Sequence, residues 1–278
     1  MQLEVKLKSR KDAIIKFDYL YEMHSALMSK IVKYNPDMAK ELHEGKHKNR
    51  IKLFVFSPLS SMPNPKLVDI EGEKRKRMMM GERLWFRIAS PLPELLNTLG
   101  ESILSARTLS FCDNEFDVAG VSVIAPPEFK EEMIWRSFGQ SASICTSWSP
   151  RSLEKKLFIY PDTTREDSPD CAKLLAANLH HKFLRLSEIR NDIAKSWLAD
   201  AGLNELPPEE SIRIEFLPLS DKQKYRTVMH YGKNSAIRTW RCPVKVKAPI
   251  PLQRLIRAAG LGSLNSQGYG LVEEGKSC

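Results

Sequence analysis

The first residues of the chain alternate between hydrophobic and polar side chains. Leu3, Val5 and Leu7 fall on one side of an extended segment, and charged residues fall on the other. Because successive side chains of a strand point to opposite faces, this alternation predicts a half-buried strand over residues 1–9. We expect neither a signal peptide here nor a membrane span elsewhere, since no hydrophobic run approaches about 20 residues.

Two helices are predicted after this strand. Residues 19–34 carry hydrophobic side chains three and four positions apart, which is helical spacing. Asn35-Pro36 should end that helix, because the residue before a proline disfavours helical backbone angles. Asp37 is then expected to cap a short helix over residues 38–44, which ends at Gly45.

The rest of the first half completes an alternating order of elements. We expect a strand over residues 51–57, a hairpin formed by residues 67–72 and 83–90, a helix over 91–106 and a strand over 116–124. The charged residues between the hairpin strands are interpreted as a solvated tip, with an RNA-backbone contact as the alternative. The order strand, helix, strand, strand, helix, strand is that of a ferredoxin-like unit.

A second unit of similar order is predicted after Pro126-Pro127, the best candidate for a linker. The sequence therefore predicts an α+β protein of two tandem ferredoxin-like (βαββαβ, RRM-like) domains facing across a central cleft, with domains over residues 1–125 and 126–278. The expected elements are short strands at 143–147 and 157–161, a long helical region to Gly202, strands at 212–217, 224–231 and 235–247, a helix at 252–259 and a last strand.

A glycine-rich loop lies between the last predicted helix and the last strand. Gly260, Gly262, Gly268 and Gly270 form two Gly-apolar-Gly pairs separated by five residues. Glycine reaches positive φ and lets another group approach the backbone closely. An ordinary helix-to-strand turn does not need four of them. The partner that approaches is either a phosphate backbone or another strand.

Charge is distributed unevenly along the chain. The net charge is +9, and no Asp or Glu occurs from Lys222 to Val272. A merely solvated surface usually mixes both signs, so this span predicts a phosphate-facing surface. No strand shows the aromatic signature of an RNA-recognition motif, which favours phosphate and shape contacts over base stacking. The candidate RNA-binding residues are Arg238, Arg241, Lys245 and Lys247, together with the four glycines.

The five cysteines are scattered and form no CxxC pair. This pattern argues against a disulfide framework and against a zinc site, and it favours a reducing cytoplasm. No carboxylate or histidine pair has metal-ligand spacing either, so we expect no metal site. We expect no other cofactor.

The glycine-rich loop resembles the signature of the Cas6 family, the CRISPR precursor-RNA endoribonucleases of the RAMP superfamily. Further similar pieces are Leu42-His43-Glu44-Gly45 before the strand that contains Lys52-Leu53-Phe54, and the stretch from Leu84 to Pro91 in which a strand runs into Ser-Pro. The resemblance implies two tandem ferredoxin-like domains. It also implies metal-independent cleavage within CRISPR repeats, which leaves a 2′,3′-cyclic phosphate and a 5′-hydroxyl.

The resemblance also suggests catalytic residues. His43 falls where the family has its usual catalytic histidine, and Lys52 matches a lysine that supports the phosphate. A histidine suits proton transfer near neutral pH, and a lysine suits a developing negative charge. The chain has Met28 where some relatives have a tyrosine, so the second acid or base is either His47 or Tyr34, although a packed core tyrosine is the expected role of Tyr34.

Two other functions remain open on the sequence alone. One is a non-catalytic RNA-binding subunit of a CRISPR effector complex, which would share the fold and the loop. The other is a basic protein that binds other RNA or DNA. The expected partner is CRISPR repeat RNA, with effector subunits and a second copy of the chain as further options and no membrane.

Overall fold

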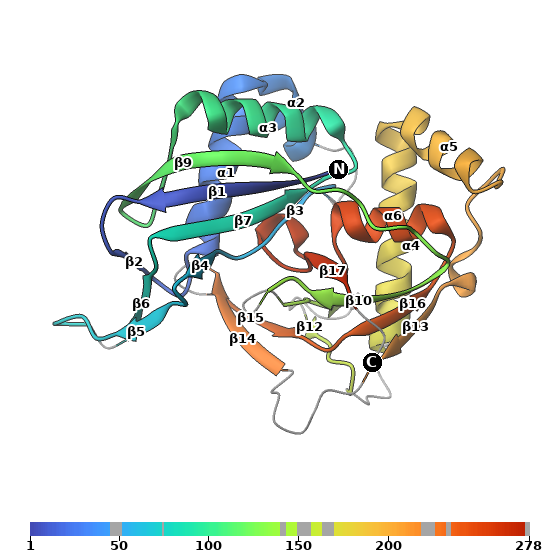
Figure 1. Ribbon diagram of the computed structural model, residues 1–278. Coiled ribbons are helices and arrows are strands. Elements are labelled where there is room, and N and C mark those ends of the chain that lie inside the picture. Colours follow the sequence, from blue (N-terminus) through green and yellow to red (C-terminus); the bar gives the residue numbers. More distant parts are fainter. Residues whose placement is uncertain are drawn as a thin grey trace.

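The computed structural model describes residues 1–44, 52–73, 75–139, 143–148, 157–162, 170–217, 226–231 and 235–275. Two antiparallel sheets, one in each half of the chain, carry helices on one face (Figure 1). In the part of the chain that the structure describes, no helix has the length and apolar character needed to cross a bilayer.

The N-terminal sheet is built around the first strand. β1 (Gln2–Ser9) pairs antiparallel with β7 (Arg83–Ala89) on one side and with β9 (Asn114–Val123) on the other. The strand order β3-β7-β1-β9-β8 is that of a ferredoxin-like sheet, in which the first and third strands are central. The remaining members are β3 (Val55–Phe56), β4 (Ser60–Met62), which also pairs with β7, and β8 (Thr108–Phe111).

The helices of this half match the predicted spacing. α1 (Leu20–Tyr34) buries the hydrophobic stripe that the sequence indicated, and α3 (Pro93–Ala106) follows β7. α2 (Pro36–Glu44) begins earlier than expected because Asn35, not Asp37, caps it: the Met38 N–H donates to Asn35 Oδ1 (3.1 Å). Pro36 then occupies the first helical position, where a proline lacks no needed donor.

The predicted hairpin of residues 67–72 and 83–90 is wrong. β5 (Lys66–Val68) pairs with β6 (Arg77–Met80), which also pairs with β2 (Ala13–Ile15) in a separate small sheet. The residues read as a solvated tip therefore include a strand, which ends in the buried Met80. Two basic residues of this stretch form ion pairs, Lys76 with Asp69 and Arg77 with Glu73.

The C-terminal sheet repeats the same topology. Its order is β13-β16-β10-β17, which places its first strand, β10 (Glu132–Ser137), beside its third, β16 (Val244–Lys247). The predicted second βαββαβ unit is confirmed, but its first strand is β10, which the sequence analysis missed. The other members are β13 (Arg213–Phe216), β17 (Val272–Glu274), α4 (Cys171–Ile189), α5 (Asn191–Asp200), the short helix η1 (Glu209–Ser211) and α6 (Ile250–Ala259).

Two small hairpin-like pairs are added to this unit. β11 (Ser147–Trp148) pairs with β12 (Leu157–Phe158), and β14 (Arg226–Tyr231) pairs with β15 (Ser235–Trp240). The turn predicted between residues 231 and 235 is thus consistent with the pairing of β14 and β15. The expected single strand over residues 235–247 divides into β15 and β16, which belong to different sheets.

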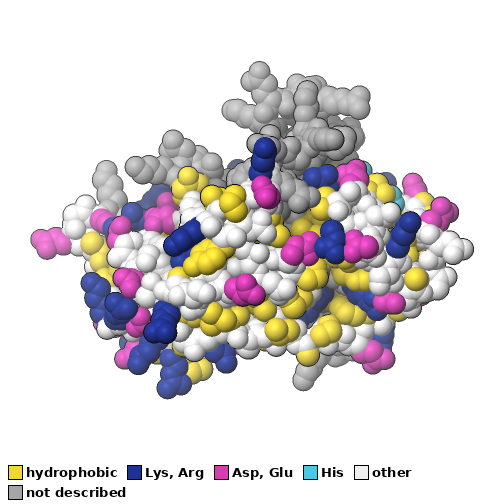
Figure 2. All heavy atoms as spheres, turned by 90° about the horizontal axis from the view of Figure 1, so that it is seen from above, with side chains coloured by type: hydrophobic (Ala, Val, Ile, Leu, Met, Phe, Trp, Pro, Cys, Tyr) yellow, Lys and Arg dark blue, Asp and Glu magenta, His cyan; other side chains and the backbone are white. Residues whose placement is uncertain are grey.

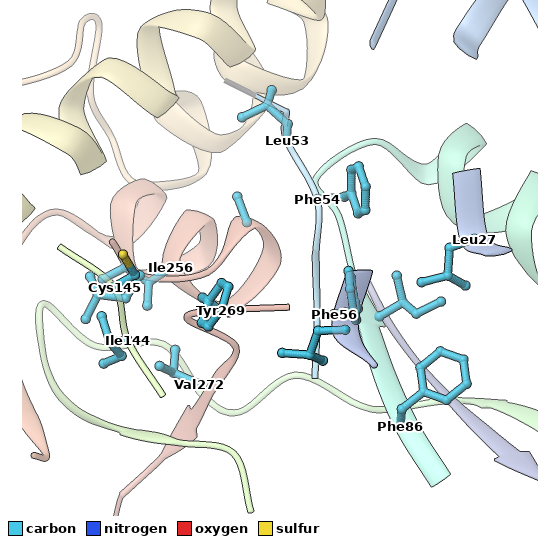
Figure 3. Packing of buried hydrophobic residues seen from close by; sticks show 14 of the residues in the cluster. Leu27, Leu53, Phe54, Phe56, Phe86, Ile144, Cys145, Ile256, Tyr269 and Val272 are labelled. Atoms are coloured by element: carbon cyan, nitrogen blue, oxygen red, sulfur yellow. The ribbon is translucent and has the colours of Figure 1, made fainter. Parts of the chain in front are cut away.

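The two halves share one continuous hydrophobic core. Phe54 and Phe56 from the N-terminal half and Tyr269 from the C-terminal half are fully buried in the same cluster (Figure 3). The predicted boundary between residues 125 and 126 falls in the segment that joins β9 to β10, and it stays a prediction.

Candidate nucleic-acid interface

The glycine-rich loop is closed by its own backbone and by the strand segment beside it. All four glycines have positive φ, between 76° and 92°. A Cβ at Gly270 would collide with the carbonyl oxygen of Leu261, and one at Gly262 with that of Cys145. The four glycines are buried, so the close approach that they allow is an approach of protein atoms, which are backbone carbonyls at Gly262 and Gly270. At Gly262 the structure shows a segment of protein, since Cys145 and Ser263 form an isolated antiparallel β-bridge, and a phosphate contact of the loop stays a prediction.

Several hydrogen bonds hold the loop in this shape. The Leu261 N–H donates to the Gly270 carbonyl (2.9 Å), and the Ser263 N–H to the Cys145 carbonyl (2.7 Å). The buried Asn265 side chain donates from Nδ2 to the carbonyls of Leu261 (3.2 Å) and Tyr269 (2.9 Å). These contacts bring the two Gly-apolar-Gly pairs side by side at the base of the loop.

The tip of the loop presents uncharged groups to solvent. It contains the short helix η2 (Asn265–Gln267), and its partly exposed residues carry hydroxyl, amide and aliphatic groups. Such groups donate and accept hydrogen bonds without adding charge. They are the part of the loop that an external ligand can reach; the residues are Ser263, Leu264, Ser266 and Gln267.

The loop lies against the N-terminal half. A Cβ at Gly268 would be 3.0 Å from Leu20 in the first turn of α1 and 3.0 Å from Phe56 in β3. The loop is therefore in contact with the helix that precedes the predicted catalytic segment, since α2 follows α1 directly and packs against it.

The predicted basic residues differ in their surroundings. Arg238 on β15 and Lys247 on β16 are exposed. Lys245 forms ion pairs with Glu132 (3.0 Å) and Glu215 (4.0 Å) from the neighbouring strands, and Glu132 raises the pKa of Lys245. Acidic side chains from other strands therefore lie beside the span from Lys222 to Val272, although the span itself contains none.

Arg241 is half-buried, and burial lowers the pKa of its guanidinium. Charges of both signs are also interspersed over the face turned to the viewer in Figure 2. Among the four predicted basic residues, Arg238 and Lys247 are the exposed ones.

The predicted catalytic residues fall on or after α1 and α2 in the sequence. His43 is next to the last residue of α2, and His47 lies outside the described residues. Lys52 is half-buried and directly precedes the buried run of residues 53–56. Tyr34 ends α1 with 44% of its surface exposed, so the expectation that it packs in the core is wrong. Met28 is buried.

Two family models match the chain over most of its length. The model of the CRISPR-associated protein Cas6, N-terminal, matches residues 14–122, and that of the CRISPR associated protein Cas6, C-terminal, matches residues 124–274. The second model alone covers more than half of the chain. This protein belongs to the Cas6 family.

Solved structures support the fold of this Cas6 family member. A Cas6-related protein from Pyrococcus furiosus is 20% identical, with a TM-score of 0.74 over 100% of this chain and 99% of that chain. A RAMP protein described as binding different RNA substrates is 19% identical, with a TM-score of 0.70 over 99% and 100%. A CRISPR associated protein Cas6 is 20% identical, with a TM-score of 0.67 over 99% of both chains. No curated protein sequence matches the chain.

Sequence reasoning missed a lysine that touches the loop of this Cas6 family member. Lys182 on α4 is fully buried, and its Nζ donates to the carbonyls of Gly260 (2.7 Å) and Gly262 (2.9 Å). A signal for it exists in the sequence, because Lys182 falls between Leu179 and Leu186 on the buried stripe of the helix. A lysine at such a position is rarely fully buried unless it is paired.

Proposed function

We propose that this Cas6 family member is an endoribonuclease that cuts CRISPR precursor RNA within its repeats without a metal ion. The observation that carries the proposal is the match of both Cas6 models, which together span residues 14–122 and 124–274. A relative of the same fold is described as binding different RNA substrates, and another as a Cas6 product complex.

The chemistry uses the RNA's own ribose. The 2′-OH gives up its proton and attacks the adjacent phosphorus, the bond from phosphorus to the 5′-oxygen breaks, and that oxygen takes a proton. The products are a 2′,3′-cyclic phosphate and a 5′-hydroxyl. The reaction needs a base, an acid and a cation that stabilises the developing charge on the phosphorane.

In the proposal, side chains between residues 34 and 52 of the N-terminal half supply these groups. His43 exchanges one of the two protons, His47 or Tyr34 exchanges the other, and Lys52 stabilises the phosphorane. The position of His43 supports its assignment, because a helix C-terminus favours a protonated imidazole. Tyr34 is 44% exposed, which supports a role at the surface and not in the core.

Binding is assigned to the other half. The partly exposed tip of the glycine-rich loop, with Arg238 and Lys247, contacts the phosphate backbone in this proposal. α1 connects the two regions, since its first turn contacts Gly268 and its last residue is followed by α2. In this proposal, RNA held on the loop extends along α1 to the predicted catalytic segment.

A cleavage assay on repeat RNA in EDTA tests the proposal. We expect cleavage to persist in EDTA and to be lost when the nucleotide before the cut is 2′-deoxy, because that substitution removes the nucleophile. Cleavage of the deoxy substrate, or dependence on a divalent ion, would rule the mechanism out. Unrelated RNA at the same salt concentration is the control for repeat specificity.

The variant His43→Ala tests the catalytic assignment. Proton transfer by a positioned side chain contributes roughly 100-fold or more to a rate, so we expect a loss of that size at nearly unchanged RNA affinity. His181→Ala is the matched control, because His181 is exposed on α4. A wild-type chain that binds repeat RNA but never cuts it would indicate a non-catalytic RNA-binding subunit.

A further inference from the structure

A buried lysine reaches the base of the glycine-rich loop from a helix distant in sequence. Lys182 lies in the middle of α4 and is 2% exposed. Its Nζ donates to the carbonyl oxygens of Gly260 and Gly262 at 2.7 and 2.9 Å. Neither the proposed cleavage chemistry nor a phosphate contact uses this side chain.

The carbonyl oxygens of Gly260 and Gly262 are acceptors that need a donor within the protein. Gly260 follows the last residue of α6, where the carbonyl end of the helix dipole is negative. Both glycines are buried, and a buried carbonyl without a partner costs about 1–3 kcal/mol. Lys182 satisfies one acceptor at the helix end and one in the loop at the same time.

This contact does not depend on the charge of the lysine. Burial lowers the pKa of Lys182 to about 7. A neutral amine retains two N–H donors, which is the number that the two carbonyls require. The link from α4 to the loop therefore survives in either protonation state.

The link fixes the base from which the loop's accessible tip projects. Gly260 and Gly262 flank Leu261, whose N–H and carbonyl are bonded across the loop to Gly270 and Asn265. Ser263, the first partly exposed residue, follows directly. A shift at the two glycines would therefore move the residues that face solvent.

We propose that Lys182 is a positioning residue that holds the glycine-rich loop in the shape in which its partly exposed tip contacts RNA. The part of this inference that concerns RNA rests on the proposed function. The part that concerns the loop does not, and it can be measured without RNA.

The variant Lys182→Met removes the donors while keeping a long unbranched side chain. We expect the amides of Leu261 and Ser263 to exchange with deuterium roughly tenfold faster or more, because the base of the loop loses two hydrogen bonds. Repeat-RNA binding should weaken roughly tenfold, and KM should rise while kcat at saturating RNA stays within about threefold.

Two controls separate positioning from a general loss of stability. Lys173→Met makes the same change at a largely exposed position of α4 and should leave both the exchange rates and KM unchanged. Leu175→Ala removes a buried side chain from α4 without a hydrogen bond to the loop. It should lower the free energy of unfolding and, by reducing the folded fraction, lower kcat rather than raise KM.

The outcomes are distinguishable. Wild-type loop exchange and wild-type RNA affinity in Lys182→Met would overturn the inference, as would an effect no larger than that of Leu175→Ala at equal stability. If the wild-type chain neither binds nor cuts repeat RNA, the proposed function fails, and the exchange measurement still decides the role of Lys182 in the loop. If Lys182→Met does not fold, Lys182→Gln, which keeps an N–H₂ donor, is measured in its place.

Discussion

Gly270 and Gly202 share a left-handed backbone but differ in what surrounds them. Their φ values are +78° and +68°, yet a Cβ at Gly270 would collide with the Leu261 carbonyl, and one at Gly202 would meet nothing within 4 Å. We predict that Gly270→Ala lowers the free energy of unfolding by about 2–5 kcal/mol, from backbone strain plus overpacking. Gly202→Ala should cost only the strain, about 1–2 kcal/mol.

Urea unfolding of both variants measures the difference. Gly270→Ala should also weaken RNA binding, whereas Gly202→Ala should not, because Gly202 follows α5 outside the loop. Equal losses of stability would show that the loop backbone relaxes around the methyl group, and that its glycines are not required by packing.

Lys182 should also make stability depend on pH. Its pKa is about 7 when folded and 10.5 in the reference state, so between these values the unfolded chain binds the extra proton. Stability therefore rises with pH across this window, by at most about 1.4 kcal/mol per pH unit. Below pH 7 both states are protonated, and the dependence from this group disappears.

The measurement compares the wild type with Lys182→Met by urea unfolding at pH 7, 8 and 9. Cysteines whose pKa is raised by burial, such as Cys171, also affect the slope, but they are present in both proteins and cancel in the difference. A difference in unfolding free energy that stays constant with pH would contradict the prediction.

The basic residues of β15 and β16 differ in whether a carboxylate neutralises them. Arg238 and Lys247 are exposed, while Lys245 is paired with Glu132. We predict that Arg238→Ala and Lys247→Ala each weaken RNA binding and lower the slope of log affinity against log salt by about 0.7, the value for one phosphate contact on a single strand.

Lys245→Ala is the internal comparison for these two variants. Lys245→Ala should lower the RNA affinity less than the other two substitutions do, because in the wild type RNA has to compete with Glu132 for the Lys245 ammonium. Binding isotherms at several salt concentrations give the three slopes. Equal slopes in all three variants would show that the carboxylates do not neutralise Lys245 toward RNA.

The order of elements could be predicted where the periodicity was long. The hydrophobic stripe of α1 and the alternation of β1 predicted these two elements of the first ferredoxin-like unit correctly. Each element is long enough for one of its faces to be buried and to show as a pattern in the sequence. β10 was missed although Met133 and Trp135 alternate inward, since its six residues lie among charged ones. The pairing of β5 with β6 was missed because pairing is set by partners distant in sequence, here β2.

The candidate site could be predicted only in part, for a similar reason. The four glycines predicted that another group approaches the loop backbone closely, but the sequence did not reveal that the carbonyl of Cys145 is the group next to Gly262. Likewise, the absence of acidic residues around Lys245 along the chain did not exclude Glu132 from its side in the sheet. Local patterns show what a residue requires, whereas the fold decides which residue supplies it.

Polar side chains also link the two halves, in addition to the hydrophobic core that they share. Arg87 on β7 bonds Glu4 in its own half (3.1 Å) and lies near Glu273 of β17 in the other (3.7 Å). Its guanidinium also lies 4.0 Å from the ring centroid of Phe138. Together with Gly268 against Phe56, this arrangement joins β7 and β3 of the N-terminal half to the C-terminal half.

Arg87→Met should therefore loosen the junction. The side chain of Arg87 is 19% exposed, and its loss leaves Glu4 and Glu273 without their shared partner. We predict a loss of about 1–3 kcal/mol in the free energy of unfolding and faster exchange of the Phe138 amide, which donates to the Leu271 carbonyl at the junction.

Arg136→Met is the matched control for this prediction. Arg136 also pairs with Glu273 (3.1 Å), but its side chain is 57% exposed, and both residues belong to the C-terminal half. Its loss should cost less than about 1 kcal/mol and leave the junction intact. If the two variants cost the same, the charge on Glu273 would be the common cause and Arg87 would not join the halves. A larger effect of Arg87→Met on repeat cleavage than on stability would indicate that the joined halves together form the site.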